Sequence, residues 1–221
     1  ICAYSHDLRD EIMGGNVNRH YRLNNYLYRN CENYPTHELG PIAKILNINR
    51  GNRMLSLVSV ASKAAGLKAF AKTDKNPDKS LADVSFAQGD IVETLIRCAG
   101  GETISLKLDT TLPKYYSREL TVRGTKGLAN QELNMIALEG EQNLHEYYEP
   151  APFVKKYFDN AGEYEKEFLH PVWRDITPEE TKLGHGGMDY IMFREFFRAV
   201  RSGEALPIDV YDAAAWMSIA A

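Results

Sequence analysis

Residues 91–109 read IVETLIRCAGGETISLKLD, and this stretch decides the fold class of the chain. In its second half, Ile104, Leu106 and Leu108 alternate with polar residues, which is the period of a strand with one buried and one solvated face. A Gly-Gly pair separates the two halves and favours a tight turn. The stretch therefore predicts an antiparallel hairpin with strands at 91–98 and 102–109.

The rest of the chain extends this hairpin into an α+β arrangement. Further strands are predicted at 54–60, at 119–123 with a return strand that follows the 124–127 turn and reaches Ala129, and at 135–139. Apolar spacing, proline starts and glycine stops predict helices at 42–48, 153–160, 188–201 and 209–220. The polar first third indicates long surface loops. We expect one open, mainly antiparallel sheet with helices on one face and at its ends.

Composition excludes several classes of protein. The chain has 221 residues, 44% of them hydrophobic and 25% charged, with a formal net charge of −4. The acidic balance argues against nucleic-acid binding, and no apolar run approaches the ~20 residues that a membrane span requires. Three cysteines without C-x-x-C spacing predict neither a disulfide framework nor a zinc site, and we predict no metal. There is also no Gly-x-Gly-x-x-Gly dinucleotide motif.

Both ends of the chain look cut. It begins Ile-Cys-Ala-Tyr without Met or a signal sequence, and it stops within a predicted helix without a stop signal. We interpret the chain as a fragment of a longer protein, and its cellular compartment stays open.

The densest polar cluster runs from Tyr34 to Pro41. Pro35 stiffens this segment, and His37 can exchange protons near neutral pH, with its pKa lowered by a nearby helix N-terminus. The alternative is a helix-capping loop in which Thr36 caps the helix and His37 makes a structural hydrogen bond.

Other candidates are more dispersed. Arg22 can hold a carboxylate or sugar hydroxyls with its planar fork, or it can be a surface charge. Of the adjacent Tyr115 and Tyr116, one ring is expected to pack on the core and the other hydroxyl to face a ligand. His185 lies in a glycine-rich helix entry suited to close approach by a ligand. His6, Asp7 and Arg9 are read as an ionic network at a strand end.

Seven short motifs then occur in one order along the chain. They are Tyr-x-His-Asp-Leu-Arg (4–9), Tyr-Arg-Leu (21–23), Tyr-Pro-Thr-His (34–37), Asn-Ile-Asn-Arg-Gly (47–51), Tyr-Ser-Arg (116–118), Gly-Thr-Lys-Gly (124–127) and His-Gly-Gly-Met-Asp (185–189). This series resembles glycoside hydrolase family 109, the NAD-dependent α-N-acetylgalactosaminidases of the Gfo/Idh/MocA oxidoreductase superfamily.

The resemblance implies that residues 1–221 form the C-terminal, substrate-binding and catalytic α+β domain. An upstream Rossmann domain would bind most of the NAD and would be this domain's partner. The resemblance further implies a carbohydrate substrate, catalytic roles for His37 and Tyr4, and substrate contacts from a second group of residues. That second group is Arg22, Tyr34, Pro35, Thr36, Tyr116 and His185.

The chemistry implied by the family is transient oxidation. NAD would take hydride from C3 of the sugar, a base would remove the acidified C2 proton, the aglycone would leave from C1, and water addition and re-reduction would follow. His37 and Tyr4 would handle the protons, with their division of roles left open. Arg22 and Tyr34 would hold hydroxyl or acetamido groups, and Tyr116 would contact the sugar ring.

Three positions depart from the family pattern, and two alternative functions stay open. Glu38 and Cys31 stand where glycine is usual, and Tyr21 stands where tryptophan is usual, so the sugar recognised is not settled. One alternative is a sugar dehydrogenase of the same superfamily. The other is an inactive fragment or an oligomerisation domain, because the superfamily uses its open sheet for subunit contacts. The resemblance suits a bacterial protein of the periplasm or cytoplasm.

Overall fold

The computed structural model describes residues 1–14 and 20–220, which form two compact units. The first unit contains residues 1–123, residues 130–132 and the C-terminal stretch from Tyr211. The second unit contains residues 124–129 and 133–210.

A four-stranded sheet organises the first unit. Its strands are β1 (Cys2–Ser5), β4 (Thr103–Asp109), β3 (Ile91–Cys98) and β2 (Met54–Ala61), in the order β1-β4-β3-β2. The predicted hairpin is confirmed, because β3 and β4 pair antiparallel with Ile96 opposite Ile104. Ile104, Leu106 and Leu108 are buried, as their alternation indicates.

One pairing in this sheet differs from the expectation of antiparallel neighbours. Strand β1 pairs parallel with β4 and places Tyr4 opposite Leu108. Every residue of β1 is buried, so its sequence shows no alternation of polar and apolar residues. That absence explains why the sequence indicated a strand end near His6 but gave no bounds for the strand.

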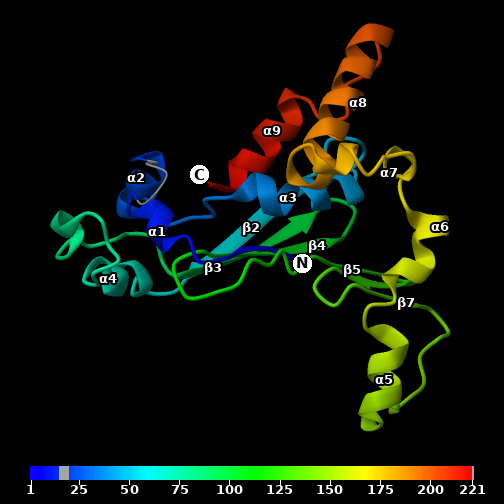
Figure 1. The fold of residues 1–221 in the computed structure, drawn as a ribbon, viewed down its shortest axis with the longest axis horizontal. Helices are drawn as coiled ribbons and strands as arrows, with labels where there is room; N and C mark the ends of the chain where they lie inside the picture. Colours follow the sequence, from blue (N-terminus) through cyan, green and yellow to red (C-terminus); the bar gives the residue numbers. More distant parts are fainter. Residues whose placement is uncertain (15–19, 221) are drawn as a thin grey trace. The chain divides into compact units, whose positions relative to one another are not determined.

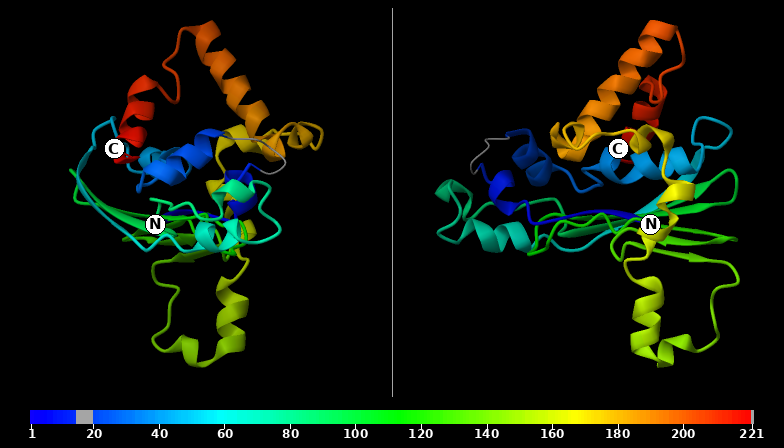
Figure 2. Two further views of the ribbon diagram at one scale, coloured as in Figure 1. Left: turned by 90° about the vertical axis from the view of Figure 1, so that its left-hand side faces the viewer. Right: turned by 45° about the vertical axis from the view of Figure 1, so that its right-hand side comes forward.

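Two helices cover one face of the sheet. They are α3 (Pro35–Ile45) and α9 (Val210–Met217), and the views in Figures 1 and 2 place both on the same side. Leu39 of α3 and Trp216 of α9 share one hydrophobic cluster with Leu106 of the sheet. The opposite face keeps Val58, Val60 and Leu95 exposed. An oligomer contact through this open face stays a prediction.

A second cluster lies among short helices of the first unit. The helices are α1 (Arg9–Ile12), α2 (His20–Tyr28), α4 (Gly66–Ala71) and the 3₁₀ helix η1 (Lys79–Leu81). Ile12, Tyr26 and Phe70 pack there with Leu108 of β4. The prediction of long loops in the first third is therefore wrong for α1, α2 and α3, whereas residues 15–19 lie outside the described residues. Helix α2 buries Arg22 and Tyr26, which lie one turn apart. The rest of the helix is mostly polar, so its sequence shows no clear apolar periodicity that would predict a helix.

Helix α3 begins earlier than predicted. The Gly40-Pro41 pair indicated a start at residue 42, yet the helix begins at Pro35 and contains Pro41 in its interior. Pro35 occupies the first turn, where its missing N–H costs nothing. Pro41, in contrast, removes an N–H donor from the interior of the helix.

The second unit combines short strands with helices. Strands β5 (Thr121–Gly124), β6 (Gly127–Asn130) and β7 (Met135–Leu138) form a sheet of order β5-β6-β7, as the second predicted hairpin required. Of β5 only Gly124 belongs to the second unit, since residues 121–123 belong to the first. The α-helices of this part are α5 (Pro150–Tyr157), α6 (Glu165–Phe168), α7 (Pro171–Arg174) and α8 (Met188–Ser202). The 3₁₀ helices are η2 (Glu146–Tyr148), η3 (Ala161–Tyr164), η4 (Glu180–Lys182) and η5 (His185–Gly187), and a further one, η6 (Ser218–Ala220), follows α9.

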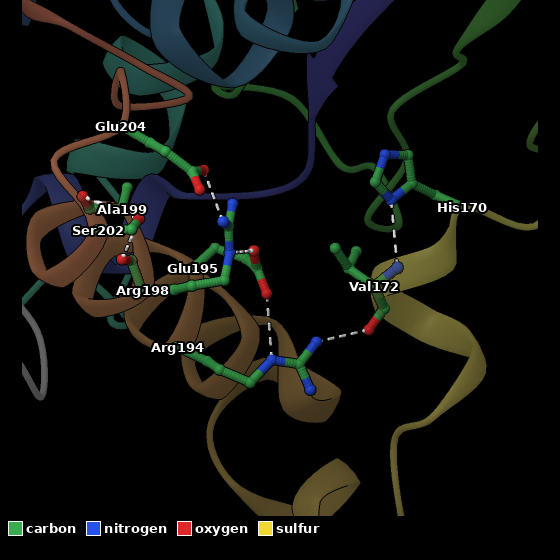
Figure 3. A network of polar contacts seen from close by, with 8 residues as sticks. All are labelled: His170, Val172, Arg194, Glu195, Arg198, Ala199, Ser202 and Glu204. Atoms are coloured by element: carbon green, nitrogen blue, oxygen red, sulfur yellow. Dashed lines mark hydrogen bonds and ion pairs between the residues drawn. The ribbon is translucent and has the colours of Figure 1, made fainter.

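Charged residues on α8 join it to α7 and to its own C-terminal end (Figure 3). Arg194 donates to the carbonyl oxygen of Val172 at 2.9 Å. Arg198 bridges Glu195 at 2.9 Å and Glu204 at 2.6 Å. These exposed pairs orient side chains along the helix but contribute little stability individually.

The Asn-Ile-Asn-Arg-Gly motif anchors α9 in the first unit. Both terminal nitrogens of Arg50 donate to the Asp212 carboxylate, at 2.6 and 2.8 Å, and the Asp212 side chain is only 2% exposed. Asn49 donates to the carbonyl oxygen of Tyr211 at 3.0 Å. The Asn-Ile-Asn-Arg-Gly motif thus has a structural role.

We predict that Arg50→Met destabilises the protein by about 3 kcal/mol, because it leaves the Asp212 carboxylate buried without its bidentate partner. This loss of stability is at the low end of the range for breaking a buried ion pair, because the Arg50 side chain itself is 37% exposed. Arg50→Lys keeps the charge and should lose less. Urea unfolding of the three proteins measures the difference, and a Met variant as stable as the wild type would show that this pair does not hold α9.

Candidate functional site

Backbone pairing on both edges of β1 positions the site in the first unit. One edge pairs with β4, and on the other edge Ser5 and Ser117 exchange two backbone hydrogen bonds of 3.1 and 2.8 Å. The Ala3 N–H also donates to the Arg118 carbonyl oxygen at 2.6 Å. The loop that carries Tyr116 and Arg118 therefore lies against the strand that carries Tyr4.

Aromatic rings from three segments gather around Tyr4. The Tyr34 ring stacks on it with centroids 4.3 Å apart, and the His37 ring lies 4.8 Å away in a tilted arrangement. His6 contacts Tyr4 edge-on at 5.0 Å and Tyr116 at 5.3 Å. The structure thus brings together the predicted residues Tyr4, Tyr34, His37 and Tyr116.

Two arginines flank this cluster. Arg22 is buried, pairs with Glu11 at 2.5 Å and lies over the Tyr34 ring at 5.5 Å. The Arg118 guanidinium lies 5.4 Å from the Tyr4 ring centroid and 5.8 Å from that of Tyr116. Arg22 is therefore a member of the cluster and not a free surface charge.

The environment of the site favours a neutral imidazole on His37 and a protonated hydroxyl on Tyr4. Partial burial lowers the pKa of His37 below its usual value, and the positive charges of Arg118 and Arg22 lower it further. Burial raises the pKa of Tyr4, and the positive charges of Arg22 and Arg118 oppose that rise in part. At neutral pH the imidazole is neutral and the phenol keeps its proton, so one can accept a proton while the other can donate one.

Two buried polar atoms of the cluster have no hydrogen-bond partner among the described residues. They are Nε2 of His6 and the hydroxyl of Tyr34. Buried polar atoms are normally satisfied, so such a pair fits a polar ligand such as a sugar or the carboxamide of a nicotinamide.

The remaining predicted residues divide between the two units. Pro35 is buried at the start of α3, and exposed Thr36 has its hydroxyl 3.4 Å from Nδ1 of His37. His185 belongs to the second unit, where Nδ1 lies 2.9 Å from an Asp189 carboxylate oxygen. The cluster of the first unit does not include His185, and its role stays a prediction.

The two tyrosines before Ser117 differ from the expectation. Neither ring packs in the core, since Tyr115 is 66% and Tyr116 59% exposed. The Tyr115 hydroxyl donates to Glu132 at 2.5 Å. Together with Arg118 and Gln131 these residues line an open cavity of about 270 Å³ beside the ring cluster.

Sequence reasoning missed three residues of the cluster. It read His6 as part of an ionic network, but only Asp7 and Arg9 form that network, with bonds of 2.8 and 2.7 Å. Glu11 had no distinguishing signal. Arg118 lies in the Tyr-Ser-Arg motif, but no local pattern indicates that it reaches the His37 carbonyl oxygen.

Metal-binding clusters and membrane-spanning helices are both absent from the described residues. In residues 1–14 and 20–220 no group of three or more His, Cys, Asp or Glu side chains is placed to hold a metal ion. No helix within those same ranges is long and apolar enough to cross a bilayer. All three cysteines are free thiols, with Cys2 and Cys98 buried.

The fold is α+β, as the sequence predicted, and comparison with known proteins identifies the family of the chain. The family model "Glycosyl hydrolase 109, C-terminal domain" matches residues 1–221. The chain therefore belongs to glycosyl hydrolase family 109.

Curated relatives agree with this assignment. The chain is 36% identical to an alpha-N-acetylgalactosaminidase of Tannerella forsythia over 99% of its own length and 48% of the relative. It is 37% identical to a family 109 protein of Stenotrophomonas maltophilia, over 99% of this chain and 50% of that protein. The chain thus spans about half the length of the curated relatives it matches.

A buried pair of carboxyl groups lies beneath the site. Glu32 and Glu38 are 1% and 0% exposed, and within the described residues none of their four carboxyl oxygens has a partner at regular hydrogen-bond geometry. Burial raises the pKa of both groups, most strongly that of Glu38, and the neighbouring Glu32 raises it further. A proton retained on Glu38 supplies the missing donor toward Glu32. Glu38 stands where glycine is usual in the family, and in this structure its carboxyl group faces that of Glu32.

We predict that Glu38→Gln stabilises the protein at pH 8 relative to the wild type, with a difference that shrinks toward pH 4.5. Because the folded-state pKa is raised, the stability contributed by the protonated pair is complete below the unfolded-state value near 4.5 and is lost as pH rises. A neutral amide donates to Glu32 without that loss.

Thermal unfolding measured across this pH range tests the prediction, with about 3 °C expected for each kcal/mol recovered. The exposed Glu93→Gln is the matched control and should show no such trend. A Glu38→Gln protein that is less stable than the wild type at pH 8 would rule out the protonated pair.

Proposed function

We propose that the complete gene product cleaves α-N-acetylgalactosaminides and that this chain binds the sugar and moves the protons. The observation that supports this most directly is that the ring centroids of His37 and Tyr4 lie 4.8 Å apart. At neutral pH the His37 imidazole is neutral and can accept a proton, whereas the Tyr4 hydroxyl keeps its proton and can donate it. The name of the Tannerella forsythia relative indicates the sugar.

Sugar binding is assigned to residues at the margin of this pair. The exposed ring of Tyr116 suits stacking on the apolar face of a sugar. The unpartnered Tyr34 hydroxyl and the planar fork of Arg22 suit hydroxyl and acetamido groups. Thr36 offers an exposed hydroxyl next to His37, and buried Pro35 fixes the backbone that presents both.

Proton transfer is assigned to His37 and Tyr4. The chemistry supplied by a bound nicotinamide is reversible oxidation at C3 of the sugar, and the resulting ketone makes the C2 proton acidic. His37, neutral at working pH, accepts that proton from C2. Tyr4, protonated at the same pH, donates to the glycosidic oxygen as the bond at C1 breaks. Neither step needs the pair of carboxylates that most glycosidases use.

We predict that His37→Asn lowers kcat by about 100-fold, because asparagine preserves polarity but cannot exchange a proton. The measurement is release of 4-nitrophenol from 4-nitrophenyl α-N-acetylgalactosaminide by the complete gene product. His145→Asn, at an exposed histidine of the second unit, is the control and should retain full turnover. Normal turnover in the His37 variant would remove it from the mechanism.

The same assay separates this function from that of a sugar dehydrogenase. A glycosidase regenerates its oxidised cofactor in each cycle, so NADH does not accumulate as glycoside is cleaved. Stoichiometric NADH release without cleavage would instead support the dehydrogenase. Absence of both activities in the complete gene product would leave the binding or oligomerisation role.

A further inference from the structure

Pro41 leaves a specific gap in the hydrogen bonding of α3. It lies four residues after His37 within the helix, where the N–H of an ordinary residue would donate to the His37 carbonyl. Proline has no N–H, so this carbonyl lacks its regular helical donor. The gap occurs at the residue to which the proton-transfer role is assigned.

Arg118 supplies the missing donor. One of its terminal nitrogens donates to the His37 carbonyl oxygen at 2.9 Å. Its own backbone is tied to β1, because its carbonyl oxygen accepts from the Ala3 N–H at 2.6 Å. Arg118 therefore links the strand that carries Tyr4 to the helical turn that carries His37.

The rest of the guanidinium faces the site. It lies over the rings of Tyr4 and Tyr116, and within the part of the chain that the structure describes it forms no ion pair with a carboxylate. Arg22, in contrast, is paired with Glu11 at 2.5 Å. The charge of Arg118 is consequently not neutralised by an adjacent anion.

We propose that Arg118 is a positioning residue for His37: it replaces the helical donor lost at Pro41 and holds a positive charge beside the imidazole. This inference rests on the proposed function, because it assumes that His37 transfers a proton. It adds a residue that acts through the backbone of His37 and not through the sugar.

The charge has a separate effect from the hydrogen bond. The charged and titratable groups that face His37 are Arg118, Arg22 and His6, with the rings of Tyr4 and Tyr34 against it. After burial, Arg118 contributes most to lowering the pKa of His37. Loss of this charge should therefore raise that pKa and move the acidic limb of the pH profile to higher pH.

Three variants of the complete gene product separate the two effects. Arg118→Met removes both bond and charge, so kcat should fall by about 10- to 100-fold with little change in KM, and the acidic limb should move to higher pH. Arg118→Lys keeps the charge, so its acidic limb should stay in place. Pro41→Ala combined with Arg118→Met restores a helical N–H to the His37 carbonyl, so kcat should recover in part while the limb stays shifted.

The outcomes distinguish this inference from the proposed function. Pro41→Ala alone should retain wild-type turnover and serves as the matched control. If Arg118→Met lowers kcat but Pro41→Ala gives no recovery, or if the acidic limb does not move, the positioning role is overturned while glycoside cleavage by the wild type still stands. If the wild type cleaves no α-N-acetylgalactosaminide, the proposed function fails first.

Discussion

Strand β1 is hydrogen-bonded along both edges, and the position of every residue in the ring cluster depends on that pairing. One edge joins the parallel partner β4, and the other joins the loop at Ser117 and Arg118. Tyr4 lies within the strand, and His6 follows directly after it. A four-residue strand with both edges paired has little freedom to shift, so Tyr4 is a fixed reference for the residues around it.

The helices complete the arrangement from the covered face of the sheet. Helix α3 packs Leu39 against the strands and presents Tyr34 and His37 at its beginning. Helix α9 packs Trp216 near Gly40 of α3 and is held by the Arg50 to Asp212 pair. Residues near the C-terminus thus support the helix that carries the proposed base, although they lie far from it in sequence.

The sequence predicted those elements whose burial is periodic. Alternation at Ile104, Leu106 and Leu108 indicated the hairpin correctly, and the apolar spacing of α8 indicated a helix with nearly the observed bounds. Strand β1 is buried on both faces, so it shows no period. In α3, the Gly40-Pro41 pair predicts a helix start at residue 42, because a proline in a first turn is far commoner than one in the interior.

The site was predictable only in part, for a related reason. The motifs shared with the family include Tyr4, Arg22, Tyr34, His37 and Tyr116, and the structure brings these together. No local pattern reveals that Glu38 faces Glu32 or that Arg118 reaches the His37 carbonyl. Such contacts depend on which chain segments meet, and that information is not contained in the spacing of residues along one segment.

The exchange of a helical N–H for an arginine side chain also constrains how this domain can evolve. Under the proposed positioning role, a proline at position 41 beside the site requires another donor to the same carbonyl, and Arg118 is that donor. A lineage that loses the arginine needs a residue with an N–H at position 41, and a lineage that gains such a residue is free to change position 118. The two positions are distant in the chain, yet they should covary among relatives, which would make their pairing visible in an alignment without any structure.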